Sequence, residues 1–315
     1  MRHKDNTLLP EGRKQKKKRG IAEISSVYHQ ELFADINSLL EEGGIHRVFS
    51  DSDTGVYLFR GDCLVFMDIL IKSFPRGLVD MVFADPPYFL SNGGITCRAG
   101  RMTCVNKGIW DRSRGIDENH RFNQAWLLRC QKILKPDGTL WVTGTHHVIY
   151  SVGFAMQQLG MKILNDITWE KPNPPPNLSC RYFTHSTETV IWAARDRRSK
   201  HLFNYGTMRK LNRGRQMKTV WTIPPPGPDE KHFGKHPTQK PVKLLERIIL
   251  ASTRENDLVF DPFTGSGTTG VAAVNLKRRF VGCELDPTFA ELAVKRLKQA
   301  TQERVVCPEI FGVRR

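Results

Sequence analysis

The sequence predicts an α/β fold with a mostly parallel sheet, and three observations support this prediction. Short apolar runs of the length of buried strands alternate along the chain with segments whose apolar residues recur at helical spacing. Two of these runs lead directly into Asp-Pro turns, at the strand ends where such sheets carry their ligand sites. The 315 residues can bury a large core, so we expect one α/β domain with an inserted smaller region.

The first half of the chain carries the alternating pattern. Residues 27–45 have apolar residues at helical spacing and stop at a Gly-Gly pair, which is a helix-end signal. Residues 56–64 and 77–84 are apolar runs too short for a helix, so they predict buried strands. A helical stretch around Trp126 precedes a third predicted strand at 138–144.

The second half returns to this pattern after a different middle section. Residues 165–171 and 188–194 predict two strands that flank a loop rich in Pro and Asn. A helix is expected at 242–252 because Pro241 opens it. The remaining expected elements are a strand at 258–260, a helix at 269–276 and a strand at 279–283.

Composition narrows the class of protein. The chain has 48 Lys and Arg against 32 Asp and Glu, a net charge of +16, which indicates an acidic partner. No window approaches the roughly 18 consecutive apolar residues of a membrane span, and the apolar content is too high for a disordered chain. The seven cysteines are an odd number without a C-x-x-C pair, which argues against a disulfide framework and a zinc site. We therefore expect no metal and a reducing compartment.

The ends and the middle of the chain differ from the predicted core. Residues 1–26 have no apolar stretch of a secretory signal and are expected to form a basic tail. Its run from Arg13 to Arg19 is either a solvated arm or a phosphate-binding or targeting patch. The expected divisions are the tail 1–26, a catalytic half 27–194, an insertion 195–235, a cofactor half 236–300 and a C-terminal tail 301–315.

The insertion 195–235 is the best candidate for a nucleic-acid surface. It holds eleven Lys and Arg against three acidic residues, with aromatic side chains between them, a mixture that suits phosphate contact and base stacking. An ordinary solvated insertion is the alternative. Side chains of these types can also contact base edges, and the candidates are Arg209, Asn212, Arg213, Arg215, Gln216 and Lys218.

A glycine-rich turn follows the predicted strand 258–260. Residues 261–270 read DPFTGSGTTG and precede a helix, a context in which a ligand can approach the backbone. Glu284 lies nineteen residues after Gly265, at the end of the next strand, where ribose hydroxyls would bind. Taken alone, this pattern fits both a dinucleotide and an adenosine-containing methyl donor.

A more restrictive motif, DPPY, ends the predicted strand 77–84. Pro86 and Pro87 remove two amide donors, so the carbonyls of Asp85 and Pro86 can turn outward as acceptors beside a carboxylate. Tyr88 adds a flat ring. Such a site suits an exocyclic amine on a planar base; a rigid proline turn is the alternative.

The two motifs in this order resemble the DNA amino-methyltransferases of the β class, in which the catalytic half precedes the cofactor half. The similarity covers about residues 55–298. It includes Gly61-Asp62, Trp110-Asp111, LKPDGTLWV at 134–142, HPTQKP at 236–241 and FVGCELDP at 280–287. The stretches DPPYFLSNGG and NLSCRYFTHSTET are similar to adenine methylases of restriction systems, including the GATC-site type.

The resemblance implies a Rossmann-like methyltransferase with a mostly parallel sheet of the seven-stranded type flanked by helices, a circularly permuted motif order and an inserted DNA-recognition region. It also implies S-adenosylmethionine as cofactor. The 261–267 loop would lie near its methionyl part, Glu284 at its ribose and Asp62 near its adenine amine, while His236, Thr238 and Lys240 would face its carboxylate. The implied cofactor residues are Asp62, His236, Thr238, Lys240, Asp261, Phe263, Gly265, Ser266, Gly267, Thr268, Thr269 and Glu284.

For catalysis the resemblance implies direct transfer to adenine N6. Asp85 and the Pro86 carbonyl would accept the two N–H bonds of the amine, and Tyr88 would stack on the flipped base, so that the implied catalytic residues are Asp85, Pro86, Pro87 and Tyr88. Trp169, Asn173 or Pro174 would form the other wall. The loop 91–115 either closes over the base or is a plain mobile loop.

Other functions remain open at this point. Asp85 rather than a serine before the Pro-Pro-Tyr favours adenine, with cytosine N4 as the nearest alternative. A nicotinamide oxidoreductase would use the glycine turn and Glu284, but this function does not explain the DPPY motif. In a non-catalytic nucleic-acid binder neither motif would have a catalytic role. The expected partner is DNA and not a membrane, with a homodimer and a cognate restriction endonuclease considered, and the expected location is the bacterial cytoplasm beside the nucleoid.

Overall fold

The computed structural model describes residues 34–91, 95–98, 101–104, 108, 111–177 and 179–306. Four expectations from the sequence therefore lie outside the described residues, wholly or in part. These are the basic tail 1–26, the first part of the helix at 27–45, parts of the loop 91–115 including Trp110, and the last residues 307–315.

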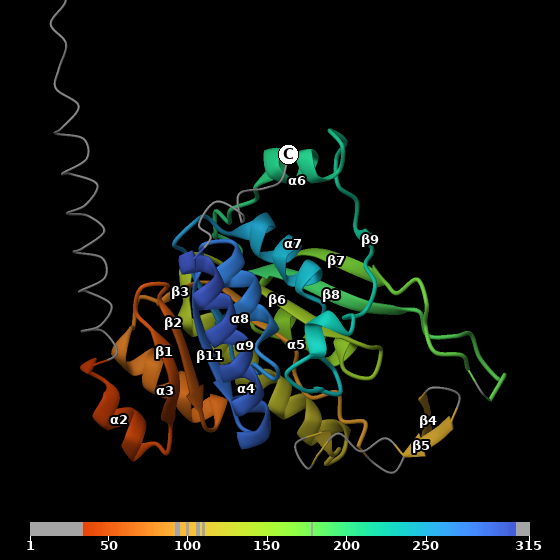
Figure 1. The fold of residues 1–315 in the computed structure, drawn as a ribbon, viewed down its shortest axis with the longest axis horizontal. Coiled ribbons are helices and arrows are strands. Elements are labelled where there is room, and N and C mark those ends of the chain that lie inside the picture. Colours follow the sequence, from red (N-terminus) through yellow and green to blue (C-terminus); the bar gives the residue numbers. More distant parts are fainter. Residues whose placement is uncertain are drawn as a thin grey trace, which may run out of the picture.

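The core is one mixed sheet of nine strands in the order β1-β2-β11-β10-β3-β6-β8-β7-β9 (Figure 1). The five strands from β2 to β6 in this order are mutually parallel, whereas β8 is antiparallel to both of its neighbours. The strands are β1 (His46–Asp51), β2 (Val56–Arg60), β3 (Val79–Ala84), β6 (Leu134–Gly144), β7 (Lys162–Glu170), β8 (Thr187–Ala194), β9 (Val220–Thr222), β10 (Leu258–Asp261) and β11 (Arg279–Glu284). A separate hairpin joins β4 (Ile95–Arg98) and β5 (Arg101–Cys104).

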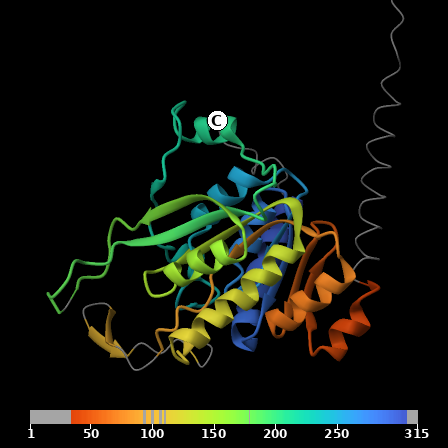
Figure 2. The same ribbon diagram turned by 180° about the vertical axis from the view of Figure 1, so that it is seen from behind.

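Helices cover both faces of the sheet. Figure 1 shows α7, α8 and α9 on one face, and Figure 2, from behind, shows α3, α4 and α5 on the other. The helices are α2 (Asn37–Glu42), α3 (Cys63–Ser73), α4 (Ile116–Ile133), α5 (Ile149–Gln158), α6 (Tyr205–Leu211), α7 (Val242–Ser252), α8 (Thr268–Asn275) and α9 (Pro287–Val306). Within the described ranges no helix is both long and apolar enough to span a membrane.

Strand β2 shows why the sheet is buried on both faces. Its successive side chains point to opposite sides. Tyr57 and Phe59 pack into the core with α3, α4 and α5, while Val56 and Leu58 pack into the core with α7, α8 and α9. Burying each such side chain stabilises the fold by about 1.5–3 kcal/mol. The continuous apolar run in the sequence therefore reflects two cores that share one strand.

The structure corrects three expectations about elements. The sheet has nine strands rather than seven, because short strands β1 and β9 add one at each edge. Within the described part of the expected helix 27–45, Ala34 is helical, a turn follows at 35–36, and α2 covers Asn37–Glu42. The last helix, α9, runs to Val306, beyond the expected boundary at residue 300, because Ala300 and Thr301 are buried against the core. The helix expected at 242–252 has those bounds.

Candidate active site

The two predicted motifs line one cavity at the carboxyl edge of the parallel strands. The DPPY turn follows β3 and the glycine turn follows β10, which is the neighbour of β3 in the sheet. The cavity has a volume of about 270 Å³. The predicted residues that line it are Asp62, Asp85, Pro86, Pro87, Tyr88, His236, Thr238, Lys240, Asp261, Phe263, Gly265, Ser266, Thr268, Thr269 and Glu284.

Asp111 fixes the DPPY turn. Its carboxylate accepts hydrogen bonds from the backbone N–H groups of Tyr88 (2.8 Å), Phe89 (2.8 Å) and Leu90 (3.2 Å), and from the hydroxyl of Ser91 (2.9 Å). Asp111 is fully buried. Since the two prolines before Tyr88 have no N–H, Asp111 takes the first three amides that the turn offers.

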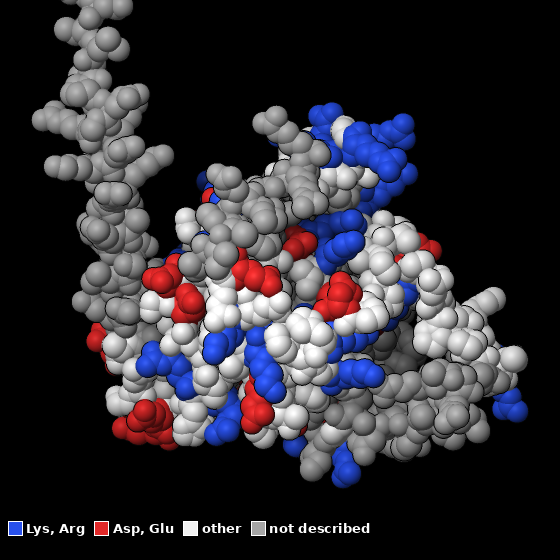
Figure 3. All heavy atoms as spheres, viewed as in Figure 1, with Lys and Arg blue, Asp and Glu red and all other residues white. Residues whose placement is uncertain are grey.

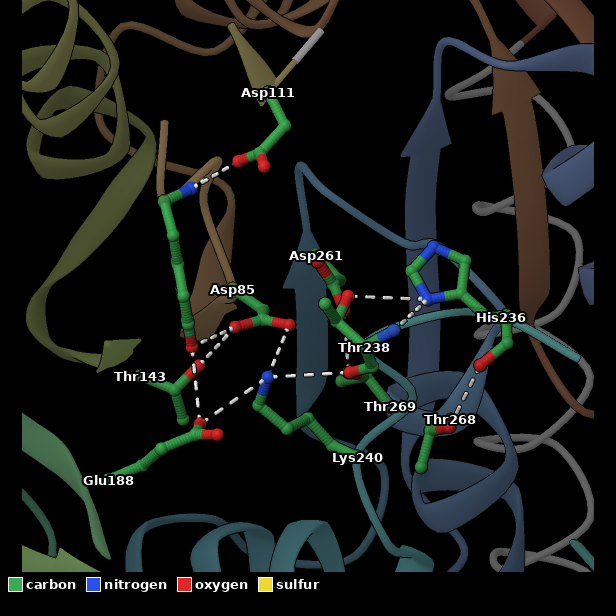
Figure 4. A network of polar contacts seen from close by, with 12 residues as sticks. Asp85, Asp111, Thr143, Glu188, His236, Thr238, Lys240, Asp261, Thr268 and Thr269 are labelled. Atoms are coloured by element: carbon green, nitrogen blue, oxygen red, sulfur yellow. Dashed lines mark hydrogen bonds and ion pairs between the residues drawn. The ribbon is translucent and has the colours of Figure 1, made fainter. Parts of the chain in front are cut away.

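Three groups converge on the carboxylate of Asp85 (Figure 4). Its Oδ1 accepts hydrogen bonds from the Thr143 hydroxyl at 2.7 Å and the Tyr88 hydroxyl at 2.8 Å. Its Oδ2 accepts one from the Lys240 ammonium at 2.6 Å. The resemblance implied that Lys240 faces the carboxylate of the methyl donor; in the structure its ammonium is bonded to Asp85, 155 residues away in the chain.

Tyr88 links this carboxylate to a second one. Its hydroxyl also donates to Glu188 Oε2 at 3.2 Å, and its side chain is nearly buried. Burial and the neighbouring carboxylates of Asp85 and Glu188 raise the pKa of Tyr88, so the phenol stays neutral and donates.

Two glycines give the 261–270 turn its shape. Gly265 has φ +54° and Gly267 has φ +79°, backbone angles that residues other than glycine rarely adopt. A Cβ at Gly265 would lie 3.2 Å from the His236 ring, and one at Gly267 would lie 3.1 Å from Ala293. The turn is held from the neighbouring strand, since Gly265 N–H donates to Glu284 Oε2 at 2.6 Å.

Asp261 is a buried carboxylate in the floor of the cavity. It accepts hydrogen bonds from Phe263 N–H at 2.9 Å and from the Thr269 hydroxyl at 2.5 Å. Burial raises its pKa to about 7, because desolvation outweighs these two hydrogen bonds and Asp85 and Glu284 add negative charge nearby.

The stability of the protein should report this titration. The native state keeps a proton on Asp261 up to about pH 7, whereas the unfolded chain loses it near pH 4. The contribution of Asp261 to the unfolding free energy is therefore fully present below about pH 4. It decreases as the pH rises to 7, by up to about 1.4 kcal/mol per pH unit. Asp261→Asn removes this loss. The unfolding free energies of the variant and the wild type are measured by denaturant unfolding from pH 4.5 to 8. The difference in favour of the variant should grow up to about pH 7 and then stay constant. A constant difference over the whole pH range would contradict the raised pKa of Asp261.

A buried arginine supports the other side of the cavity. Arg296 donates to the Ser266 carbonyl and hydroxyl at 2.8 and 3.0 Å and to the Thr268 hydroxyl at 2.8 Å. Burial lowers its pKa to about 10, which still leaves it charged. The sequence did not single out Arg296, because it lies on α9, 30 residues after Ser266.

These groups fit an adenosine-containing ligand with a charged tail. Carboxylates of Asp62 and Glu284 stand at neighbouring strand ends, and the buried cation lies under the glycine turn. Gln239 also lines the cavity, and its buried Oε1 has no hydrogen-bond partner among the described residues, which leaves an acceptor for a ligand donor.

Comparison with known proteins identifies the family. Residues 79–295 match the DNA methylase family, of the N6/N4 methyltransferase type. The chain belongs to this family. It is 56% identical over 230 residues to the type II methyltransferase M2.DpnII of Streptococcus pneumoniae, covering 73% of this chain and 85% of the relative. It is 48% identical over 257 residues to the type II methyltransferase M2.MboI of Moraxella bovis, covering 82% and 93%.

Solved structures support the same assignment. The crystal structure of the M1.HpyAVI–SAM complex matches with a TM-score of 0.59 and 26% identity, over 77% of this chain and 98% of that one. The cytosine-N4-specific PvuII DNA methyltransferase shares the fold, with a TM-score of 0.58 and 20% identity over 81% and 94% of the two chains. The Rossmann-like methyltransferase fold expected from the sequence is thus confirmed for this DNA methylase.

One predicted DNA contact of the methylase is wrong. Trp169 is 2% exposed, its Nε1 donates to the Ile223 carbonyl at 2.7 Å, and its ring packs in the core rather than at the cavity. Asn173 is exposed in the loop between β7 and β8. The six candidates of the insertion lie on α6 and in the turn after it, and none of them lines the cavity.

Sequence reasoning missed four residues that complete the methylase site. Asp111 was noted only as part of a family match, and Thr143, Lys171 and Glu188 were not considered. The last three lie at or near a strand end at the carboxyl edge of the sheet: Thr143 in β6, Lys171 after β7 and Glu188 in β8. A charged residue inside an otherwise apolar strand, as in TETVIWAA, is the signal that could have identified Glu188.

Proposed function

We propose that this methylase transfers a methyl group from S-adenosylmethionine to N6 of adenine in DNA. The observation that carries the proposal is the single cavity lined by both the DPPY turn and the glycine turn. A donor held on one side of this cavity and a base held on the other would meet without any rearrangement of the two turns. The match to the DNA methylase family supports the same reading.

The chain offers suitable partners for each part of the donor. The carboxylate of Glu284 and that of Asp62 are acceptors for ribose hydroxyls and for the adenine amine. The hydroxyl of Thr238 and the His236 ring lie on the side where the donor's carboxylate would bind. When bound, S-adenosylmethionine supplies an electrophilic methyl group on a sulfonium.

The DPPY turn prepares the amine for attack. The lone pair of adenine N6 is delocalised into the ring, so the amine must be held in a geometry that exposes this pair. Asp85 and the Pro86 carbonyl accept its two N–H bonds, and positioning supplies much of the rate. As the new N–C bond forms and the methyl–sulfur bond breaks, Asp85 stabilises the positive charge on nitrogen and the excess proton leaves through it. Tyr88 is the stacking face for the base.

The base must leave the duplex to reach this cavity. Lys and Arg gather on the lobe formed by α6 and the turn after it (Figure 3), and this lobe is our proposed phosphate and base-edge contact. The exposed members that carry it are Arg209, Arg213, Arg215, Gln216 and Lys218, together with the partly buried Asn212. The residues 195–235 would thus serve as the target-recognition insertion between the catalytic and cofactor halves.

The resemblance to adenine methylases of restriction systems supports a proposal for the target site, and the type II relatives support one for the setting. We propose GATC as the recognition sequence, the bacterial cytoplasm with its nucleoid as the location, and a cognate restriction endonuclease as the companion enzyme. A homodimer is part of the same proposal.

A protection assay tests the site. Plasmid prepared without GATC methylation is incubated with the protein and S-adenosylmethionine, then cut by a nuclease that requires unmethylated GATC. Full protection that depends on the methyl donor is expected. Incorporation of methyl groups without protection would contradict GATC, and sequencing of the modified plasmid would then give the true site.

A further inference from the structure

Lys240 occupies the place that the target amine needs. Its Nζ lies 2.6 Å from Asp85 Oδ2 and 5.4 Å from the centre of the Tyr88 ring. Asp85 Oδ1 already accepts from the hydroxyls of Thr143 and Tyr88, so Oδ2 is the oxygen best placed to accept from a base. A base that stacks on Tyr88 and bonds to Asp85 therefore meets the ammonium of Lys240.

Lys240 cannot leave Asp85 without another partner. Its side chain is only 7% exposed, and an unpaired ammonium in such surroundings is strongly unfavourable. Burial by itself would lower the pKa of Lys240, but the carboxylates of Asp85 and Glu188 outweigh burial and raise it. The group therefore stays charged and needs a counter-charge at all times.

A second carboxylate lies within reach of Lys240. Glu188 Oε2 is 3.6 Å from Nζ, about 1 Å farther than Asp85 Oδ2 (Figure 4). Glu188 is held at the start of β8 by an ion pair to Lys171 at 2.5 Å and by the Tyr88 hydroxyl at 3.2 Å. Burial would raise its pKa, but Lys240 and Lys171 outweigh burial and lower it, so Glu188 is ionised.

We propose that Lys240 holds Asp85 while no base is present and moves to Glu188 when the target base enters. Glu188 is then a positioning residue, which acts through Lys240 by keeping a buried counter-charge ready for it. After the movement both ammonium groups are paired with Glu188. Asp85 keeps the hydroxyls of Thr143 and Tyr88 and gains the N–H of the base, so no buried ammonium is left without a carboxylate when the neutral base enters. This inference rests on the proposed function of the DPPY cavity.

A double-mutant cycle on base capture tests the exchange. The variants are Glu188→Gln, which keeps size but removes charge, Lys240→Met, which removes the ammonium, and the double variant. The probe is a duplex with the natural target adenine, which carries the N6 amine; permanganate oxidation of the thymine opposite it rises when the adenine leaves the stack. Cofactor affinity, duplex affinity and the thermal melt are measured alongside.

The expected pattern is specific. Glu188→Gln leaves Lys240 on Asp85 and lowers the captured fraction by about 10-fold, with cofactor and duplex affinities within about threefold of the wild type. Lys240→Met captures the base at least as well as the wild type, because the competitor is gone. In the Lys240→Met background, Glu188→Gln changes capture by less than about twofold.

Three results would overturn the exchange: unchanged capture in Glu188→Gln, reduced capture in Lys240→Met, or the same loss from Glu188→Gln in both backgrounds. Lys240→Met alone remains decisive if the glutamine variant does not fold. Methyl transfer by the wild type distinguishes a failure of this inference from a failure of the proposed function. Without wild-type methyl transfer the proposed function fails, whereas wild-type transfer with additive variants contradicts only the role of Lys240.

Discussion

Replacing Asp85 with asparagine is expected to lower methyl transfer by at least about 100-fold, because the amine loses a charged acceptor and the developing ammonium loses its counter-charge. Asparagine keeps the shape of the turn, so the cofactor should still bind. The substitution also leaves the Lys240 ammonium, 7% exposed, without its main partner. Transfer of labelled methyl groups to DNA, normalised to folded protein, measures the effect.

Asp80→Asn is the matched control for this experiment. Asp80 lies on the same strand and also pairs with a lysine, Lys135 at 2.7 Å, but it does not line the cavity. Its replacement should leave the transfer rate per folded protein within about threefold of the wild type, since Asp80 bonds to Lys135 and to the Leu258 N–H and does not line the cavity. Equal losses in both variants would mean that Asp85 acts through stability and not through the amine.

Replacing Asp111 with asparagine is expected to lower both the stability of the protein and the rate of methyl transfer. The amide can accept through only one atom, so some of the four donors from residues 88–91 lose their partner in a fully buried place. We expect a loss of about 2–4 kcal/mol in unfolding free energy. The rate should fall by about 10- to 100-fold in the protein that remains folded, because Tyr88 is no longer fixed.

Asp117→Asn provides the comparison, since Asp117 is exposed in the first turn of α4. It should cost at most about 1 kcal/mol through the helix dipole and leave the rate unchanged. If Asp111→Asn unfolds at the same denaturant concentration as Asp117→Asn, the described anchoring of the DPPY turn is wrong.

The cofactor half was the most predictable part of this protein. The helix that Pro241 opens has the predicted bounds, and the glycine turn lies between a strand and a helix as expected. Both features depend on local rules, because Pro fixes φ at a helix start and Gly permits φ values near those of Gly265 and Gly267.

Trp169 shows why other parts could not be predicted. Around Trp169 its strand alternates polar and apolar residues, which places Trp169 on the same face of the sheet as Ile167. This alternation does not indicate whether that face meets the cavity or the core, which is decided by packing. Strand β9, only three residues long, pairs with β7 beside Trp169 and helps to bury it. A strand this short leaves no periodic pattern in the sequence.

The ion pair of Lys240 with Asp85 had no local signal either. Its members are 155 residues apart, and only the neighbouring positions of the DPPY turn and the HPTQKP segment in the folded sheet bring them together. Most of the residues predicted for the cofactor and the base line the cavity, whereas other lining residues, such as Gln239, and the contacts among them required the structure.

Nucleoside analysis shows which base receives the methyl group and whether Asp85 is needed for the transfer. DNA that lacks methylated bases is incubated with the protein and S-adenosylmethionine carrying a heavy methyl label, digested to nucleosides and analysed by mass spectrometry, with Asp85→Asn in parallel. We expect heavy N6-methyladenine with the wild type and almost none with the variant. Label in N4-methylcytosine would contradict the adenine target, and equal label with the variant would contradict the role of Asp85.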